Sequence, residues 1–250
     1  MIELNKIYNE DCLEGMKRIP DKSVDMILCD LPYGTTACKW DTIIPFEPLW
    51  EQYERIIKDN GAIVLTASQP FTSALIMSNP KLFKHAWVWN KRFGANFAVA
   101  KYQPMKIHED VVVFAKGRCN YYPQKTKREK PIKMGKNRSV SGSVNLKYAK
   151  DEYKGKVYDE KNPESILFFD TRKEGKKNHP TQKPVALFEY LIRTYTNENE
   201  TILDNCMGSG TTAIACLNTN RNFIGFELDE TYFNLANDRI AKHLIERQGD

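Results

Sequence analysis

Two short segments far apart in the chain join apolar runs to residues that can do chemistry. Residues 27–34 read Ile-Leu-Cys-Asp-Leu-Pro-Tyr-Gly, and residues 202–211 read Ile-Leu-Asp-Asn-Cys-Met-Gly-Ser-Gly-Thr. Each pattern predicts a β-strand that ends in an acid and runs into a turn. The first segment suits a flat base that carries an amine, and the second suits a nucleoside. Together they predict group transfer onto a nucleobase.

The first segment, Asp30–Tyr33, is suited to orienting an exocyclic amine. Such an amine has two hydrogens and a lone pair delocalised into the ring, so a site that accepts both hydrogens makes the nitrogen more nucleophilic. The Asp30 carboxylate can accept one hydrogen, and the backbone carbonyl of Leu31 can accept the other. Pro32 restricts Leu31 to extended conformations, and Tyr33 offers a ring for base stacking. The alternative is a strand-to-loop turn with an incidental acid.

The second segment predicts a nucleoside-binding turn. Asp204 ends the expected strand, Gly208 and Gly210 allow positive φ and close approach of a ligand, and Thr211 opens the following helix. Glu227 ends the next expected strand, where its carboxylate can accept hydrogen bonds from both ribose hydroxyls.

The glycine turn alone also leaves a nicotinamide-dependent oxidoreductase open. Ala213 stands where a dinucleotide-binding motif has its third glycine, and variants of that motif tolerate alanine. The Asp30 segment, however, has no role in hydride transfer.

A sheet must position these segments, and the hydrophobic pattern predicts one. Strands are expected at residues 24–29, 62–67, 83–90, 109–116, 201–205 and 222–227. Helices are expected at residues 46–58, 69–78, 185–195, 209–219 and 230–246, with Gly61 closing the first of them. Residues 91–108 contain Gly94 and Pro104 and are expected to form a long loop. The alternation predicts an α/β fold with a mostly parallel, doubly wound sheet.

A basic insertion interrupts this pattern. Residues 118–178 contain 17 Lys and Arg against 8 Asp and Glu, although the whole chain has a net charge of only +5. Tyrosines alternate with the lysines there, at positions 121, 122, 148, 153 and 158. Cations and aromatic rings together suit a nucleic-acid backbone and its bases. A solubilising loop is the alternative.

Composition excludes several other classes of protein. A chain of 250 residues with 41% hydrophobic content can form one α/β core. No apolar run reaches the roughly 18 residues of a membrane span, and residues 1–10 lack a signal-peptide pattern. The six cysteines include no Cys-x-x-Cys pair and the four histidines are dispersed, so no metal site is expected. These features predict a soluble cytoplasmic protein.

The combination of segments resembles the circularly permuted (β-group) S-adenosylmethionine-dependent DNA amino-methyltransferases. In that family a D-P-P-Y-type motif comes first, a target-recognition region follows, and the cofactor motif comes last. Residues 202–212 resemble the family pattern L-D-P-F-x-G-S-G-T-T, with Asn205-Cys206-Met207 in place of Pro-Phe-x. The run His-Pro-Thr-Gln-Lys-Pro at 179–184 and the segment Asp11–Glu14 also resemble family segments. Leu31 replaces the first proline, but its role is that of a backbone carbonyl.

The resemblance implies a Rossmann-like methyltransferase fold, with S-adenosyl-L-methionine as the cofactor. It assigns residues 1–117 to the catalytic half of one domain, 118–178 to an inserted target-recognition region, and 179–250 to the cofactor-binding half. The residues implied at the base are Asp30, Leu31, Pro32 and Tyr33. The residues implied at the cofactor are Asp11, Cys12, Lys183, Asp204, Gly208, Gly210, Thr211 and Glu227.

Two residues near these segments each have two possible roles. Lys183 is expected either to contribute charge near the cofactor carboxylate or to cap a helix. Trp40 is expected either to support the base pocket or to act as a hydrophobic anchor.

The implied activity is direct methyl transfer to the N6 amine of adenine in DNA, since Asp at the first motif position goes more often with adenine. Cytosine N4 is the alternative, and a non-catalytic DNA-binding protein of the same fold is a further one. DNA is the implied partner, with the base flipped from a duplex or a single strand. A homodimer and a cognate restriction endonuclease are candidate partners.

Overall fold

A computed structural model describes residues 2–35, 41–133, 157–171 and 182–248. Trp40, Tyr148 and Tyr153, and residues 179–181 of the His-Pro-Thr-Gln-Lys-Pro run, lie outside the described residues. The chain divides into two compact units, one formed by residues 1–122 and 165–250 and the other by residues 123–164.

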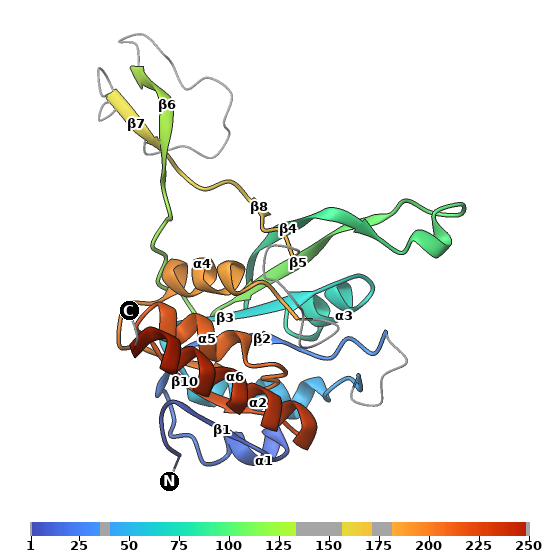
Figure 1. Cartoon of the computed structure of the whole chain (residues 1–250), viewed down its shortest axis with the longest axis vertical. Coiled ribbons are helices and arrows are strands. Elements are labelled where there is room, and N and C mark those ends of the chain that lie inside the picture. The colour runs from blue at the N-terminus through green and yellow to red at the C-terminus, as the bar shows by residue number, and fades with distance from the viewer. Residues whose placement is uncertain (1, 36–40, 134–156, 172–181, 249–250) are drawn as a thin grey trace. The chain divides into compact units, whose positions relative to one another are not determined.

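The larger unit is built on a mostly parallel sheet (Figure 1). Its strands are β1 (Lys6–Tyr8), β2 (Val24–Asp30), β3 (Ile57–Ala67), β4 (Phe83–Ala95), β5 (Lys106–Phe114), β8 (Ile166–Phe168), β9 (Thr201–Asp204) and β10 (Asn222–Phe226). Within the described residues their order across the sheet is β1-β10-β9-β2-β3-β5-β4-β8. Among these described strands, β5 alone runs antiparallel to its neighbours, β3 and β4.

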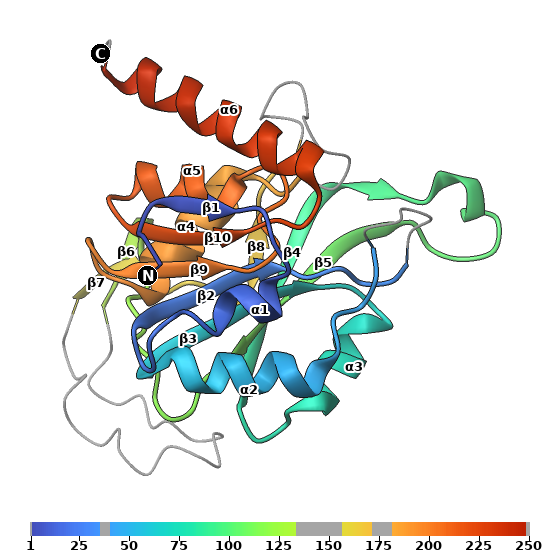
Figure 2. The ribbon, with the colours of Figure 1, turned by 90° about the horizontal axis from the view of Figure 1, so that it is seen from below.

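Helices cover both faces of the sheet, as Figure 2 shows edge-on. The helices on one face are α1 (Cys12–Met16), α2 (Phe46–Ile56) and α3 (Phe71–Ser78), and those on the other are α4 (Val185–Tyr195), α5 (Thr211–Asn218) and α6 (Glu230–Gln248). Strand β2 contributes side chains to the hydrophobic core on each face of the sheet, because successive side chains of a strand point to opposite faces. Ile27 and Cys29 belong to the core under α2, whereas Met26 and Leu28 belong to the core under α4.

This architecture confirms the predicted α/β fold with a doubly wound, mostly parallel sheet. The expected helix at 185–195 has the bounds of α4, and the strands and helices expected after residue 200 agree with the structure to within two residues. β1 and α1 were not predicted, because elements of three and five residues show too little periodicity.

Two local predictions were wrong. Gly61 does not close a helix; it lies inside β3, where a Cβ would come within 2.8 Å of the backbone oxygen of Asp25. Residues 91–108 are not one long loop. β4 continues to Ala95 and β5 begins at Lys106, and a short 3-10 helix, η1 (Phe97–Val99), lies between them.

We call residues 91–108 the β4–β5 arm. It extends past the helices at the edge of the sheet in both ribbon views (Figures 1 and 2). The backbone pairing continues from Asn90 opposite His108 to Ala95 opposite Lys106, across an irregularity. Most of the arm is exposed, including Phe97 at 83% and Tyr102 at 88%.

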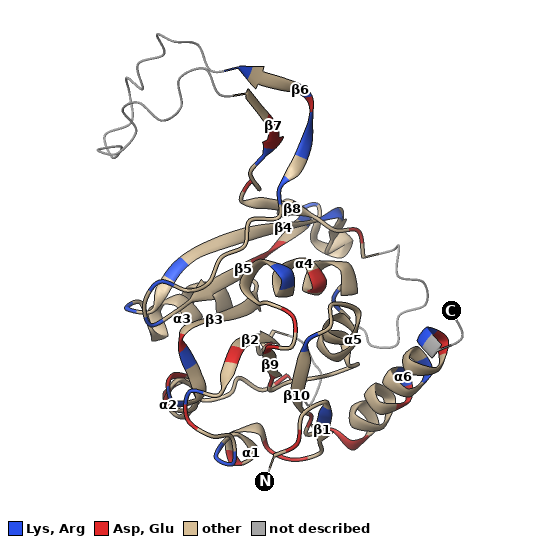
Figure 3. Ribbon diagram, turned by 90° about the vertical axis from the view of Figure 1, so that its left-hand side faces the viewer, with Lys and Arg blue, Asp and Glu red and all other residues tan. Residues whose placement is uncertain are grey.

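The smaller unit, residues 123–164, contains a two-stranded antiparallel sheet. Its strands are β6 (Thr126–Lys133) and β7 (Val157–Lys161). Four of the eight residues of β6 are Lys or Arg, and Figure 3 colours these positions blue along the strand. The predicted insertion was wider, at 118–178; residues 166–168 form β8, which pairs with β4 in the main sheet. No helix among the described residues is long and apolar enough to cross a bilayer.

Candidate active site

The two chemical segments meet where the winding of the sheet changes direction. β2 and β9 are parallel neighbours, with Ile27 opposite Leu203. From β2 the sheet continues through β3, and from β9 it continues the other way through β10. Ligands of doubly wound sheets bind beyond the carboxyl ends of strands at such a switch point. Asp30 and Asp204 are the last residues of these two strands.

One cavity of about 1220 Å³ joins the two segments. Its wall contains every predicted site residue except Gly210: Asp11, Cys12, Asp30, Leu31, Pro32, Tyr33, Lys183, Asp204, Gly208, Thr211 and Glu227. The described wall also has more acids than bases, so a cationic ligand is favoured there.

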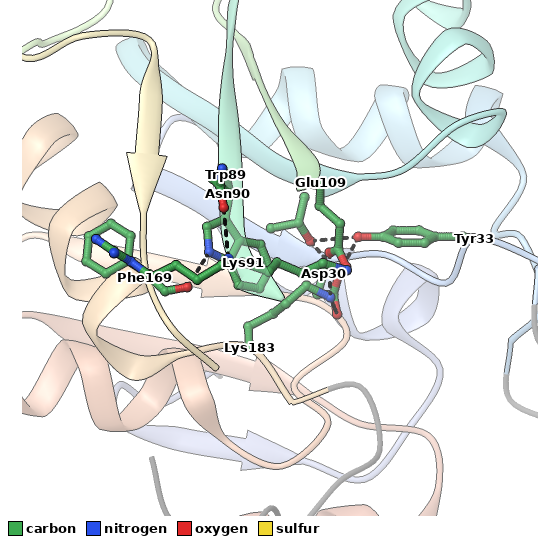
Figure 4. Close-up of polar contacts among 10 residues, drawn as sticks. Asp30, Tyr33, Trp89, Asn90, Lys91, Glu109, Phe169 and Lys183 are labelled. Carbon is green, nitrogen blue, oxygen red and sulfur yellow. Dashed lines mark hydrogen bonds and ion pairs between the residues drawn. The ribbon is translucent and has the colours of Figure 1, made fainter. Parts of the chain in front are cut away.

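The Asp30 carboxylate is tightly held (Figure 4). Its Oδ1 accepts hydrogen bonds from the hydroxyl of Tyr33, at 2.8 Å, and from that of Thr66 on the neighbouring strand β3. Its Oδ2 accepts a hydrogen bond from Nζ of Lys183 at 2.6 Å. The carboxylate is therefore fixed from two sides and only 24% exposed.

Lys183 does not cap helix α4, whose N-cap residue is Pro184. Its ammonium lies between Asp30 and Glu109, with Nζ 3.5 Å from Oε2 of Glu109. Lys91 binds the other oxygen of Glu109, Oε1, at 3.0 Å. Two carboxylates and two ammonium groups thus alternate along one side of the cavity (Figure 4).

The pKa values of this network favour the charged forms. Burial would lower the pKa of Lys183, but Asp30 and Glu109 raise it above its usual value. Burial would raise the pKa of Glu109, but the ammonium groups of Lys183 and Lys91 outweigh burial and hold it below the usual value. Sequence reasoning missed Glu109 and Lys91. The only signal was an acidic pair, Glu109-Asp110, at the start of an apolar strand.

The loop after Asp30 is shaped by a second acid. The backbone amides of Gly34 and Thr35 donate hydrogen bonds to the Asp41 carboxylate at 2.8 and 2.9 Å. Gly34 has φ +66°, where a Cβ is unfavourable. The Tyr33 ring stacks on Phe71, with 5.2 Å between ring centroids. Burial raises the pKa of Tyr33 well above its usual value, so its hydroxyl is a stable donor to Asp30.

In the second half of the cavity, the Glu227 carboxylate is held against the glycine turn. Its Oε2 accepts a hydrogen bond from the amide of Gly208 at 2.7 Å, and its Oε1 accepts one from the amide of Asp229 at 2.9 Å. Burial raises the pKa of Glu227 above its usual value. A hydroxyl that donates to this carboxylate would favour its charged form.

Asp204 binds the start of the same turn. Its Oδ1 accepts a hydrogen bond from the amide of Cys206 at 3.0 Å, and its Oδ2 accepts one from the Thr212 hydroxyl. Burial nevertheless raises the pKa of Asp204 to about 6. Asp204 is 2% exposed, so it stabilises the turn through these hydrogen bonds from inside the protein.

The two glycines of the turn have different surroundings. Gly208 has φ +53°. Among the described residues, a Cβ there would meet only one atom, the backbone oxygen of Cys206 at 3.9 Å, so this side of the turn is open. Gly210 has φ +80°, and a Cβ there would lie 3.2 Å from the Cβ of Ala236 on α6. Gly208 thus leaves room on the cavity side, whereas Gly210 allows α6 to pack closely.

Two further predicted cofactor residues lie at the start of α1. The Asp11 carboxylate caps this helix by accepting a hydrogen bond from the amide of Leu13 at 2.8 Å. The Cys12 sulfur lies 3.6 Å from the side-chain amide of Asn205. Asn205 in turn accepts a hydrogen bond from the buried Tyr53 hydroxyl. The replacement of Pro-Phe by Asn205-Cys206 is therefore accommodated by polar contacts.

The sequence that forms this cavity matches a known family. The model of the DNA methylase family, which comprises the N6 and N4 methyltransferases, matches residues 24–238. The chain belongs to this family. It is 28% identical over 260 residues to the Type II methyltransferase M1.MboII of Moraxella bovis, covering 95% of this chain and 96% of the relative. It is 27% identical to the DNA adenine methyltransferase YhdJ of Escherichia coli strain K12, covering 96% of this chain and 85% of the relative.

Solved structures give the same result. The crystal structure of the M1.HpyAVI-SAM complex matches with a TM-score of 0.65 and 26% identity, covering 94% of this chain and 98% of that one. The cytosine-N4-specific PvuII DNA methyltransferase matches with a TM-score of 0.64, covering 97% of this chain and 92% of that one, but at 14% identity it shows the fold alone. This methylase acts on DNA with S-adenosyl-L-methionine as its cofactor. The acidic wall and the open side of Gly208 fit a sulfonium nucleoside.

Proposed function

We propose that the protein methylates the N6 amine of adenine in DNA. The observation that carries this proposal is that Asp30 and the glycine turn line one cavity at the switch point of the sheet. An amine that reaches the carboxyl end of β2 thus enters the same cavity as the cofactor's nucleoside.

Each half of the cavity has a distinct role in this proposal. Glu227 and Asp11 bind the cofactor's nucleoside, and Gly208 leaves space for it. Bound S-adenosylmethionine supplies an electrophilic methyl group on a sulfonium sulfur. The Asp30 carboxylate and the Leu31 carbonyl accept the two amine hydrogens, so that the nitrogen lone pair is directed at the methyl group. Tyr33 and Thr66 keep Asp30 in one orientation.

Adenine is favoured over cytosine by two observations. Asp occupies the first position of the catalytic motif, as the resemblance associates with adenine. A relative that aligns over 96% of this chain is named a DNA adenine methyltransferase. Cytosine N4 is the second candidate, because the amine chemistry is the same and the PvuII enzyme shares the fold.

Two basic segments are proposed to bind DNA. The β4–β5 arm contains Lys91, Arg92, Lys101 and Lys106 and no acid between residues 91 and 108. Six of its residues, 91, 93–96 and 106, line the cavity. The unit at 123–164, within the predicted insertion 118–178, has the lysine-rich strand β6. We assign target recognition to this unit, since phosphate contacts position a protein and base contacts specify the site.

A labelling experiment tests the function. Purified protein is incubated with methyl-labelled S-adenosylmethionine and DNA of mixed sequence, and the DNA is digested to nucleosides. We expect the label in N6-methyldeoxyadenosine. Label in N4-methyldeoxycytidine alone would select the second candidate, and DNA binding without any label would indicate a non-catalytic protein.

A further inference from the structure

The Asp30 carboxylate already has three donors before a target base arrives. Tyr33 and Thr66 donate to Oδ1, and the ammonium of Lys183 lies 2.6 Å from Oδ2. Under the proposed function, on which this inference rests, the target amine must also donate to Asp30. Lys183 is 7% exposed, so its charge cannot move into water when the amine binds. A buried ammonium without a partner would be costly.

The neighbouring carboxylate offers the ammonium a second position. Oε2 of Glu109 lies 3.5 Å from Nζ of Lys183 and has no hydrogen-bond partner among the described residues. Oε1 of the same carboxylate is bound to Lys91 at 3.0 Å. Glu109 is 16% exposed, so this oxygen, whose contact with Lys183 is long at 3.5 Å, is an acceptor in the cavity wall that can take a shorter hydrogen bond.

We propose that Lys183 is a displaceable ammonium, which holds Asp30 until the target amine arrives and then moves to Oε2 of Glu109. Each oxygen of Glu109 then has one ammonium, and Oδ2 of Asp30 is released to the amine. The flexible lysine stem allows this movement without a backbone change. The number of buried charges does not change: in the second state both ammonium groups are paired with Glu109, while Asp30 keeps its hydrogen bonds from Tyr33 and Thr66 and gains one from the amine. Lys183 and Glu109 are positioning residues in this scheme.

Kinetics of three variants test the movement. Glu109→Gln keeps the shape of the side chain but removes the negative charge to which Lys183 moves. The target amine must then compete with Lys183 for Asp30. We expect kcat with DNA to fall about tenfold or more, while the dissociation constant for S-adenosylmethionine stays unchanged. Lys183→Met leaves Asp30 poorly oriented, and we expect a loss in kcat of about 100-fold. The double variant should be no slower than Lys183→Met, because no ammonium remains to be received.

Lys58→Met is the matched control. Lys58 binds Asp25, also at 2.6 Å, at the opposite end of strand β2. This variant removes an equally short lysine–aspartate pair outside the cavity wall, and we expect kcat to stay near that of the wild type. A Glu109→Gln enzyme as fast as the wild type, or effects that simply add in the double variant, would overturn the inference.

A crystal structure of the wild type tests the movement without any variant. The enzyme is crystallised with S-adenosylhomocysteine and a duplex that carries its target sequence, found by methylation-aware sequencing. We expect Nζ of Lys183 to lie nearer to Oε2 of Glu109 than to Oδ2 of Asp30. Nζ still bound to Asp30 with the base in place would refute the displacement. A wild-type enzyme that labels no DNA base would instead refute the proposed function, and this inference with it.

Discussion

Asp30 combines a simple chemical role with a demanding environment. Its two oxygens accept from Tyr33, Thr66 and Lys183, three side chains that come from three different parts of the chain. The carboxylate is thus placed by the fold and not by its own rotamer preference. Such preorganised groups keep their orientation while charge develops on a reacting atom.

Replacing Asp30 with Asn should test this role directly. The amide keeps the shape but loses one acceptor and the negative charge, so we expect kcat to fall about 100- to 1000-fold. Binding of S-adenosylmethionine, measured by calorimetry, should be almost unchanged. Asp25→Asn, at the other end of β2, serves as the control and should lower stability without a comparable loss of kcat. Equal losses of kcat in the two variants would contradict the role of Asp30.

Asp204 should leave a signature in the pH dependence of stability. Its folded pKa is about 6, against a usual value of 3.8, because of burial. Between these values the native state binds more protons than the unfolded chain, so the free energy of unfolding falls as pH rises. Relative to Asp204→Asn, the wild type should lose up to about 3 kcal/mol between pH 4 and 6. Urea unfolding of both proteins across this range measures the difference, and a difference independent of pH would show that burial does not control this group.

The sequence singled out the candidate chemical residues more readily than the side chains that contact them. Asp30 and Asp204 could be predicted because each ends an apolar run and precedes a distinctive turn. Glu109 could not be predicted, because its position in the cavity wall depends on how the strands pair. β5 lies between β3 and β4, and Trp89 of β4 is opposite Glu109. Lys183 was singled out, but no local pattern predicts that its ammonium reaches a residue 153 positions earlier.

At the level of elements, the two glycines of the turn face different surroundings. A Cβ at Gly208 would meet open space, whereas a Cβ at Gly210 would press on Ala236 of α6. Glycine is therefore favoured at Gly208 by open space beside the cavity and at Gly210 by close packing against α6. The sequence pattern alone did not distinguish these two constraints.

Alanine at each glycine should separate these reasons. Both changes put a side chain at positive φ, which costs about 1–2 kcal/mol. Gly210→Ala should lower the melting temperature further, because α6 must move. Gly208→Ala should chiefly weaken binding of S-adenosylmethionine, because its methyl group enters the cavity. Thermal melts and calorimetry on both proteins check this, and the opposite ranking would mean that the turn is misassigned.

The β4–β5 arm was predicted as a loop because glycine and proline interrupt its pattern. Backbone pairing with the opposite strand maintains it instead, as far as Ala95 and Lys106. Lys91 and Arg92 lie in β4 and Lys106 lies in β5, whereas Lys101 lies in the turn beyond these strands. Cations along such a ribbon suit contacts with phosphates.

Neutralising two cations of the arm should weaken DNA binding without sequence preference. For Lys101→Gln with Lys106→Gln, we expect lower affinity for every duplex and a salt dependence reduced by about 2 in log–log slope. Lys242→Gln on the exposed face of α6 is the control and should change neither value. Fluorescence anisotropy at several salt concentrations provides the measurement. An unchanged slope in the double variant would remove the arm from the DNA interface.

At the level of the whole molecule, the boundaries of the two compact units differ from the boundaries predicted from the sequence. Every described residue of the cavity wall lies in the larger unit, within residues 1–122 or 165–250. The ends of the smaller unit join segments that are fixed in the larger one: the Tyr122 amide donates to the carbonyl of Thr194, and the Val88 amide donates to that of Ser165.

Replacing residues 123–164 with a short Gly-Ser linker should therefore leave the cavity intact. We expect S-adenosylmethionine to bind with unchanged affinity, while methylation of the target sequence falls at least about tenfold through lost DNA contacts. Calorimetry and site-resolved methylation measure the two effects. Retained site selectivity would place target recognition elsewhere, and lost cofactor binding would show that the larger unit needs the smaller one to fold.

The interleaving of strands has a consequence for biosynthesis. β2 lies against β9, and the edge strand β1 is held by β10, so both strands await partners that are synthesised at least about 170 residues later. A nascent chain that stops before residue 201 has Asp30 but no strand to complete the crevice beside it. We therefore expect fragments released early by the ribosome to be inert toward the genome, so that only chains with both halves can mark DNA.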